Sequence, residues 1–341
     1  MKVIYSGVEY DYYDRARGLS FEHNNFYGTL KNMEGVQTIY FPYDRILEVG
    51  LRRFNEELID LIRREKPHIF FAVMFTDELL PETLIEIKKH TRAIAWMCDD
   101  HWRFHNYSRY YAPYFSTVIT TFSKAEKWYL KEGIHHVIRS QWGCNPYYWY
   151  PIETPKDIGV SFIGQKTQSR ARIIESLKSV GVDVYTRGWG WEGGKVNQEE
   201  MIQIINRSKI NLNINSSLPF FSLKRFGRLF LKRSHNTFVV SGDIVNNTKA
   251  FLNMSIPQIK ARPFELGGCR AFVISGLADD MGTYYKEGEE MVFYRNTDEL
   301  AVLIKEYLND NSRRESIAEA CFRRTLRDHT YEARLRNIFA M

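Results

Sequence analysis

The chain of 341 residues has little cysteine and no long apolar run. Its four cysteines, at positions 98, 144, 269 and 321, show neither metal-binding spacing nor the density of a disulfide framework. No window approaches the roughly 18 consecutive apolar residues that a membrane span requires. The first residues predict a strand rather than a leader peptide. These absences exclude a disulfide scaffold and an integral membrane protein, and they predict a cytoplasmic protein.

Acidic residues are slightly outnumbered, since 47 Lys and Arg against 41 Asp and Glu give a formal net charge of +6. An excess this small does not indicate a nucleic-acid-binding protein, but it suits phosphorylated ligands or anionic surfaces. Hydrophobic residues make up 44% of the chain. A chain of this length and composition has enough apolar residues for two domains with separate cores.

Strand-like and helix-like segments alternate along the whole chain. Short apolar runs such as 68–74, 93–100 and 158–164, separated by helical patterns, are typical of buried parallel sheets. The stretch 145–157, rich in proline and aromatic residues, interrupts the alternation and is interpreted as a linker. We therefore predict an α/β protein with two doubly wound, Rossmann-like domains that face one another across a cleft. Ligands of such sheets bind at the carboxyl ends of the strands.

The predicted first domain covers 1–150, and the second covers 151–320 with an insertion at 216–257. A C-terminal helix at 321–341 is expected to cross back to the first domain. In the insertion, Phe220, Phe221, Phe226 and Phe230 are interleaved with five cations.

Three interpretations of 219–233 stay open. The segment could form an amphipathic helix on an anionic membrane, a dimer contact, or a helix whose Phe stripe packs in the core.

The loop after the strand 158–164 is a candidate phosphate site. Gly164 lets the backbone approach a ligand, and the helix that follows favours an anion at its N-terminus. Lys166 and Arg170 can neutralise a phosphate. The alternative is an ordinary strand-to-helix turn with surface cations.

The stretch 188–194 formally matches G-x-G-x-x-G. Tryptophans fill two variable positions, and the predicted helix starts several residues late, which excludes a dinucleotide-binding fingerprint. Beside Gly188, the ring of Trp189 could instead flank a base or a sugar.

The stretch 260–276 holds the strongest candidates. A helix that begins near Arg262 and Phe264 would present amides and a cation to a phosphate. Glu265 could accept hydrogen bonds from two neighbouring hydroxyls, the arrangement that a ribose offers. Gly267 and Gly268 would permit close packing of helix and ligand. The alternative is a helix start at which Glu265 only complements the helix dipole.

The first half offers an acidic pair, Asp99 and Asp100, where a strand ends. Paired carboxylates there could act as a base or orient acceptor hydroxyls, although a loop of solvated charges is the alternative. His101 lies beside them as an acceptor-side candidate, but no Cys/His cluster completes a metal site.

The long loop 7–24 suits acceptor binding. Its candidates are Gly7, Arg15, Arg17 and Glu22. A mobile surface loop without such a role is equally consistent with the sequence.

On these stretches the chain resembles group-1-type glycosyltransferases of the GT-B fold, and within them the CgeB-like (spore maturation protein-like) branch. The resemblance rests on R-x-F-E at 262–265, G-x-E-x-V at 288–292, H-T-Y-x-x-R at 329–334 and "WMCDDHWRF" at 96–104. It implies transfer of a sugar from a nucleotide-diphospho-sugar on the second domain to a glycan, protein or lipid-linked acceptor on the first. It also implies retention of configuration without a metal cofactor. Neither a nucleic-acid partner nor an oligomeric state is implied.

The resemblance assigns Glu265 to the ribose-binding glutamate of the family and Arg262 to the arginine before it. It places Gly164, Lys166 and Arg170 on the phosphate-side loop, where cations would stabilise the departing diphosphate.

Asp99 and Asp100 match the acidic pair on the acceptor side, where they would orient or deprotonate a hydroxyl. One departure concerns Pro257, because relatives often carry a second glutamate at this position, eight residues before Glu265. Two other functions stay open: a nucleotide-sugar epimerase on the same fold, and a non-catalytic coat or scaffold protein that keeps the fold.

Overall fold

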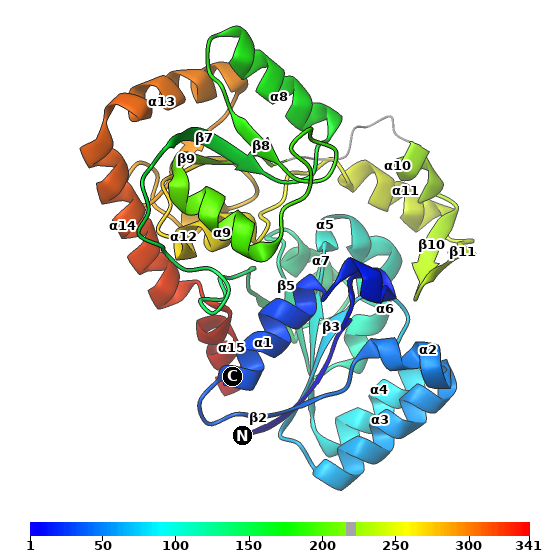
Figure 1. Cartoon of the computed structure of the whole chain (residues 1–341). Helices are drawn as coiled ribbons and strands as arrows, with labels where there is room; N and C mark the ends of the chain where they lie inside the picture. Colours follow the sequence, from blue (N-terminus) through cyan, green and yellow to red (C-terminus); the bar gives the residue numbers. More distant parts are fainter. Residues whose placement is uncertain (216–222) are drawn as a thin grey trace. The chain divides into compact units, whose positions relative to one another are not determined.

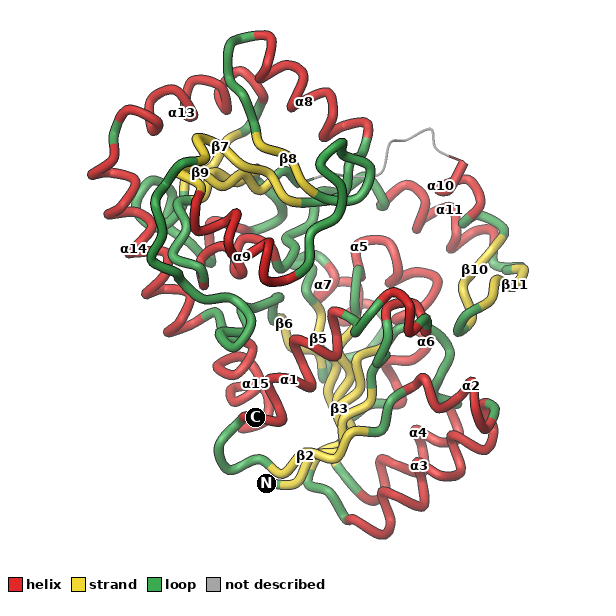
Figure 2. Tube along the Cα trace, in the orientation of Figure 1, coloured by secondary structure: helices red, strands yellow, loops and turns green. Residues whose placement is uncertain are grey.

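The computed structural model describes residues 1–215 and 223–341, which form two compact units (Figures 1 and 2). Unit 1 comprises Met1–Gln141, Phe220–Ile256 and Phe339–Met341. Unit 2 comprises Trp142–Pro219 and Pro257–Ile338. The division differs from the predicted boundaries in two respects. The linker-like stretch belongs to unit 2, and the insertion belongs to unit 1 rather than to the second domain.

Unit 1 is built on a six-stranded parallel sheet in the order β2-β1-β3-β4-β5-β6. Its strands are β1 (Lys2–Ser6), β2 (Gln37–Tyr40), β3 (Ile69–Met74), β4 (Arg92–Met97), β5 (Thr117–Thr120) and β6 (Val137–Arg139). The helices between them are α1 (Gly28–Asn32), α2 (Ile46–Val49), α3 (Leu51–Glu65), α4 (Pro81–His90), α5 (Asp100–Arg103), α6 (Arg109–Tyr111) and α7 (Ala125–Lys131). A π-helical turn, η5 (Phe104–Ser108), joins α5 to α6.

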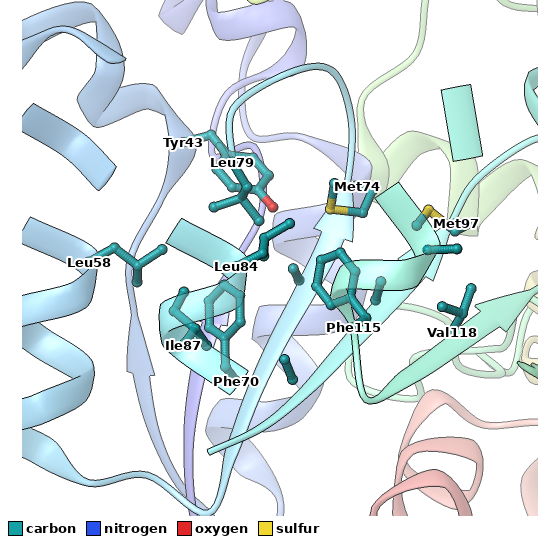
Figure 3. Packing of buried hydrophobic residues seen from close by; sticks show 14 of the residues in the cluster. Tyr43, Leu58, Phe70, Met74, Leu79, Leu84, Ile87, Met97, Phe115 and Val118 are labelled. Carbon is teal, nitrogen blue, oxygen red and sulfur yellow. The ribbon is translucent and has the colours of Figure 1, made fainter. Parts of the chain in front are cut away.

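The central strands β3 and β4 of unit 1 bury both faces, as their nearly continuous apolar sequences predict. On one face, Phe70 and Met97 belong to a core that includes Leu58 of α3 and Leu84 of α4 (Figure 3). On the other face, Phe26 packs against the Trp96 ring with a centroid distance of 4.9 Å. Successive side chains of a strand point to opposite faces, so each strand contributes to two cores.

The insertion forms four short elements, α10 (Leu223–Gly227), β10 (Leu231–Ser234), β11 (Thr237–Val240) and α11 (Ile244–Asn253). Strands β10 and β11 form an antiparallel hairpin, and α11 packs against α5 and η5. Asn106 donates a hydrogen bond of 3.0 Å to Asn247, and Tyr110 donates one of 3.0 Å to Asp243. These contacts assign the insertion to unit 1.

A continuous amphipathic helix over 219–233, one of the interpretations left open by the sequence, is not formed within the described residues. Helix α10 ends at Gly227, and the chain turns into β10 four residues later. Arg225 is buried and donates a 2.9 Å hydrogen bond to the Phe251 carbonyl, so it caps the C-terminal end of α11 rather than facing solvent. Phe220 and Phe221 lie outside the described residues.

Unit 2 holds a five-stranded parallel sheet in the order β13-β12-β9-β7-β8. Its strands are β7 (Ile158–Ile163), β8 (Tyr185–Arg187), β9 (Ser208–Asn213), β12 (Val273–Gly276) and β13 (Val292–Tyr294). Its helices are α8 (Gln168–Ser179), α9 (Gln198–Arg207), α12 (Arg262–Gly268), α13 (Thr297–Asn309), α14 (Asn311–Asp328) and α15 (Tyr331–Ala340). The last residues of α15 return to unit 1.

The core of unit 2 lies between the sheet and three helices. Val160, Leu212 and Ile274 of the sheet belong to the same apolar cluster as residues of α8, α13 and α14. Helices α9 and α12 contact the strands β7, β9 and β12. Within the described part of the chain, no helix is both long enough and apolar enough to cross a membrane.

Candidate functional site

Two loops meet at the carboxyl edge of the sheet of unit 2, one after β7 and one after β8. The Gly164 amide donates to the Arg187 carbonyl (2.9 Å), and the Lys166 amide donates to the Trp189 carbonyl (2.8 Å). Gly188 has φ +127°, and a Cβ there would lie 2.3 Å from the Gly164 carbonyl oxygen. Only glycine allows this approach. The G-x-G-x-x-G match is therefore a turn that pairs with the phosphate-side loop, and α9 begins only at Gln198.

The two tryptophans of this turn differ in exposure. Trp191 donates its indole N–H to the Gly164 carbonyl at 2.9 Å, and the Lys166 ammonium lies 5.2 Å from its ring centre. Trp189 is 62% exposed. Trp191 therefore closes the loop, whereas the Trp189 ring is available to a ligand.

Arg170 lies in the first turn of α8, whose N-cap is Thr167. Its guanidinium donates to the Ile214 carbonyl (3.0 and 3.1 Å) and to the Gln165 carbonyl (3.0 Å). Burial lowers the pKa of Arg170, and the positive charge of Arg262 lowers it further. The positive charges of Arg170 and Arg262 thus repel one another, and a diphosphate bound between them would relieve that repulsion.

Arg262 and Glu265 form an ion pair of 3.0 Å within α12. The Arg262 guanidinium also lies 5.1 Å from the Trp149 ring centre and 3.1 Å from the Met201 sulfur. Glu265 is only 5% exposed, and burial raises the pKa of its carboxyl although Arg262 opposes the shift. The ion pair engages Oε2 of the carboxylate.

Three other predicted ligand contacts in α12 instead face the protein. Phe264 is fully buried, with the His329 ring 5.6 Å away. A Cβ on Gly267 would lie 2.3 Å from the Thr325 hydroxyl, and one on Gly268 would lie 2.2 Å from the Cys144 sulfur. The glycines let α12 approach α14 and the segment before β7. Neither they nor Phe264 line a ligand site, which corrects the prediction.

Residues of the H-T-Y-x-x-R motif, 329–334, pack against α12. The Arg334 guanidinium carbon lies 5.1 Å from the Phe264 ring centre, and its Nη2 lies 3.4 Å from Nδ1 of His329. The other ring nitrogen of His329 hydrogen-bonds the Tyr284 carbonyl at 2.7 Å. Burial, reinforced by Arg334, lowers the pKa of His329 to about 4. His329 and Arg334 of the motif are therefore buried packing partners of α12, the helix that carries Glu265.

The lowered pKa of His329 predicts that the protein loses stability as the pH falls. An unfolded histidine takes up a proton near pH 6.5, whereas folded His329 does so near pH 4. The contribution of neutral His329 to the free energy of unfolding is present above pH 6.5 and is lost as the pH falls towards 4. The difference in unfolding free energy between wild type and His329→Gln should shrink by about 2 kcal/mol between pH 7 and pH 5.

Urea unfolding at several pH values measures this difference. His135→Gln, at an exposed site, is the matched control and should leave the wild-type pH slope unchanged. A constant gap between wild type and His329→Gln over this range would contradict the assignment.

In unit 1 the two predicted carboxylates, Asp99 and Asp100, lie in different environments. Asp100 is fully buried and accepts a 3.0 Å hydrogen bond from Tyr129, and burial raises its pKa. Asp100 therefore belongs to the core and does not act on an acceptor, contrary to the prediction. Asp99 has φ +58° and is half-buried. This left-handed residue turns the chain from β4 into α5, and the two neighbouring side chains differ in burial.

Glu22, named from the sequence as part of the acceptor-binding loop 7–24, has a perturbed carboxyl in the structure. Burial raises the pKa of its carboxyl to about 7, with added repulsion from Asp11 and Asp99. A carboxyl with this pKa can exchange a proton near neutral pH. Nothing in the sequence predicted its raised pKa, because only the fold brings it near Asp99.

The remaining acceptor-side candidates are dispersed. Arg15 lines an open cavity of about 890 Å³ beside the edge of the sheet, whereas Arg17 is paired with Asp11 at 2.6 Å on the surface. Gly7 follows β1, and a Cβ there would lie 2.4 Å from the Tyr5 hydroxyl. His101 is buried with its ring 6.1 Å from that of Phe122, so it does not face an acceptor, contrary to the prediction. Among the described residues, no three His, Cys, Asp or Glu side chains are grouped to hold a metal ion.

Residues 233–340 match a family model described as glycosyl transferase-like. This region includes α12 with Arg262 and Glu265. No curated protein sequence matches the chain.

Solved structures with the same fold are numerous. A glycosyltransferase from Rickettsia africae is 9% identical with a TM-score of 0.62, covering 99% of this chain and 97% of that one. HepE from Anabaena in complex with UDP is 10% identical with a TM-score of 0.59, covering 100% of both chains. Sucrose-phosphate synthase from Thermosynechococcus elongatus is 10% identical with a TM-score of 0.56, covering 99% of both. The chain therefore has the GT-B fold, with two Rossmann-like units built on parallel sheets.

Proposed function

We propose that the protein transfers a sugar from a nucleotide-diphospho-sugar to an acceptor hydroxyl. The observation that carries this proposal is the Arg262–Glu265 pair beside Arg170 at the carboxyl edge of the sheet of unit 2. The family match over 233–340 and the fold shared with glycosyltransferases support it. Structures of HepE are described as complexes with UDP and with UDP-glucose, which makes uridine nucleotides the first donors to test.

Donor binding in this proposal uses unit 2. Oε1 of Glu265 accepts a hydrogen bond from a ribose hydroxyl, and the exposed Trp189 ring flanks the base or the sugar. As the bond between the anomeric carbon and the phosphate oxygen breaks, negative charge grows on the diphosphate. Arg262, Arg170 and Lys166 stabilise that charge. This supply of cations is the reason for proposing a reaction without a metal cofactor.

The acceptor side belongs to unit 1 in this proposal. Asp99 orients or deprotonates the acceptor hydroxyl, a role that buried Asp100 is unable to share. The acceptor is a glycan, a protein or a lipid-linked sugar. By analogy with the fold relatives and the CgeB-like branch, we propose that the sugar keeps its anomeric configuration.

Thermal unfolding with a panel of nucleoside diphosphates and nucleotide sugars tests the donor assignment. One base should raise the melting temperature by about 5 °C at ligand concentrations near 100 times Kd. Glu265→Gln should lose this shift, whereas Glu306→Gln, which alters an exposed glutamate of α13, should keep it. No response to any nucleotide would contradict the proposed function and favour a scaffold role.

An epimerase is separated from a transferase by its products. An epimerase would convert the donor to an isomeric nucleotide sugar without an acceptor, whereas a transferase releases the nucleoside diphosphate.

A further inference from the structure

The insertion of unit 1 exposes an unusual amount of apolar surface. Val240 is 80% exposed, Val245 69% and Phe238 67%. Other exposed apolar side chains of the same segment are Phe230, Leu231, Val239, Ile244 and Leu252. Single exposed apolar side chains are common, but a group of this size marks a surface that meets something other than water.

Strand β11 is exposed on both faces. It pairs with β10 alone in the described part of the chain, and all four of its residues, Thr237 to Val240, are exposed. A two-stranded ribbon is only marginally stable in water, and edge strands are normally protected by charges or proline. The side chains of β11 carry neither. This ribbon therefore lacks the usual protection on the strand where it is most apolar.

Helix α11 continues the apolar surface. Its inner side, with Ala250 and Phe251, is buried, and the helix packs against α5 and η5. Ile244 and Leu252, two turns apart, are 54% and 55% exposed, and Lys249 is exposed beside them. A helix with one face in the core and an apolar outer face has a second surface to cover.

Cations outnumber acids in the insertion. Residues 223–256 contain six Lys and Arg and one acidic residue, Asp243. Arg228 and Arg233 lie over the rings of Trp102 and Tyr12, both at 4.3 Å from the ring centre. Lys232 of β10 is exposed. The insertion therefore combines exposed apolar side chains with an excess of positive charge.

We propose that the β10–β11 hairpin and the outer side of α11 bind the surface of an anionic lipid bilayer. Phe238, Val240 and Val245 enter the interfacial layer, and Lys232 meets the headgroups. A flat protein partner would cover one face of β11, whereas lipid surrounds a ribbon on both faces. This surface differs from the amphipathic helix considered for 219–233, and its proposal does not depend on the proposed reaction.

Co-sedimentation of the full chain with vesicles tests the proposal. The protein should sediment with vesicles of equal parts phosphatidylglycerol and phosphatidylcholine, but not with phosphatidylcholine alone. The double variant Phe238→Ser/Val240→Ser should bind at least ~10-fold more weakly, because each substitution removes an apolar side chain whose transfer into the interface favours binding. Val302→Ser, at a site 64% exposed on α13, is the matched control and should bind like wild type.

Charge gives a second measurement. Lys232→Glu should weaken binding to the anionic vesicles, and rising salt should weaken wild-type binding, because headgroup attraction is screened. Thermal unfolding should show that all variants fold, since the replaced side chains are exposed. Equal sedimentation of wild type and the double variant would overturn the proposal. A wild-type dimer that the double variant converts to a monomer, without vesicle binding, would also overturn it and assign the surface to a second copy.

Discussion

Arg262→Ala is expected to lower kcat for sugar transfer by roughly 100-fold or more, the range seen when one preorganised group that stabilises transition-state charge is removed. The guanidinium lies 3.0 Å from the Glu265 carboxylate and repels Arg170, and the proposed function assigns the departing diphosphate to this position. Because that charge grows as the bond breaks, KM for the donor should change less than kcat. Release of nucleoside diphosphate under steady-state conditions measures both parameters.

Two further variants make this result interpretable. Arg262→Ala leaves buried Glu265 without its cation and lowers stability, so Arg262→Lys is the second test. Lysine retains the charge but not the planar fork, and an intermediate loss of kcat is expected. Arg313→Ala, which removes an exposed arginine paired with Glu306 at 2.6 Å, should leave kcat unchanged. A change of about threefold is small for a group that stabilises transition-state charge. If folded Arg262→Ala and Arg262→Lys both turn over within about threefold of wild type, the assignment of Arg262 to the site is refuted.

Gly188→Ala should cost at least ~3 kcal/mol of stability, or displace the loop that carries Trp189. The reason is steric, because a Cβ would lie 2.3 Å from the Gly164 carbonyl oxygen at a φ of +127°. Relief of this clash separates the two loops and breaks the hydrogen bond from the Lys166 amide to the Trp189 carbonyl. Affinity for the nucleotide should therefore fall by about 10-fold or more. Urea unfolding and titration calorimetry with the responding nucleotide measure the two effects.

The same loop supplies the control. Gly194 has φ +70° and no atom within 4 Å of the Cβ position. Gly194→Ala should therefore cost only ~1 kcal/mol, for the backbone conformation alone. Equal losses in both variants would show that conformational strain, rather than close approach of the two loops, accounts for the effect.

The secondary structure of both sheets was largely predictable because it depends on local periodicity. The helical pattern between the apolar runs 68–74 and 93–100 predicted α4, and the runs 68–74 and 158–164 predicted β3 and β7. One difference is the C-terminal region, expected as one helical stretch but divided into α14 and α15 around His329. His329 bonds the Tyr284 carbonyl there, a partner 45 residues away in sequence.

The candidate site was predictable only in part. Arg262 and Glu265 share a face because they are three residues apart on a helix, and this spacing can be read from sequence. Gly267, Gly268 and Phe264 contact residues from distant segments of the chain. The packing role of these three residues could therefore not be predicted from the sequence. The same holds for Glu22, whose pKa depends on burial by residues far away in sequence.

The sequence by itself determined the alternation of strands and helices, the two parallel sheets and the cationic and acidic residues at their edges. These follow from apolar periodicity and from residue types, which act over a few residues. Only the tertiary structure decided that Asp100 is in the core while Asp99 is not, and that the insertion belongs to unit 1. Burial and long-range packing depend on segments brought together from distant parts of the chain, and no local pattern encodes that choice.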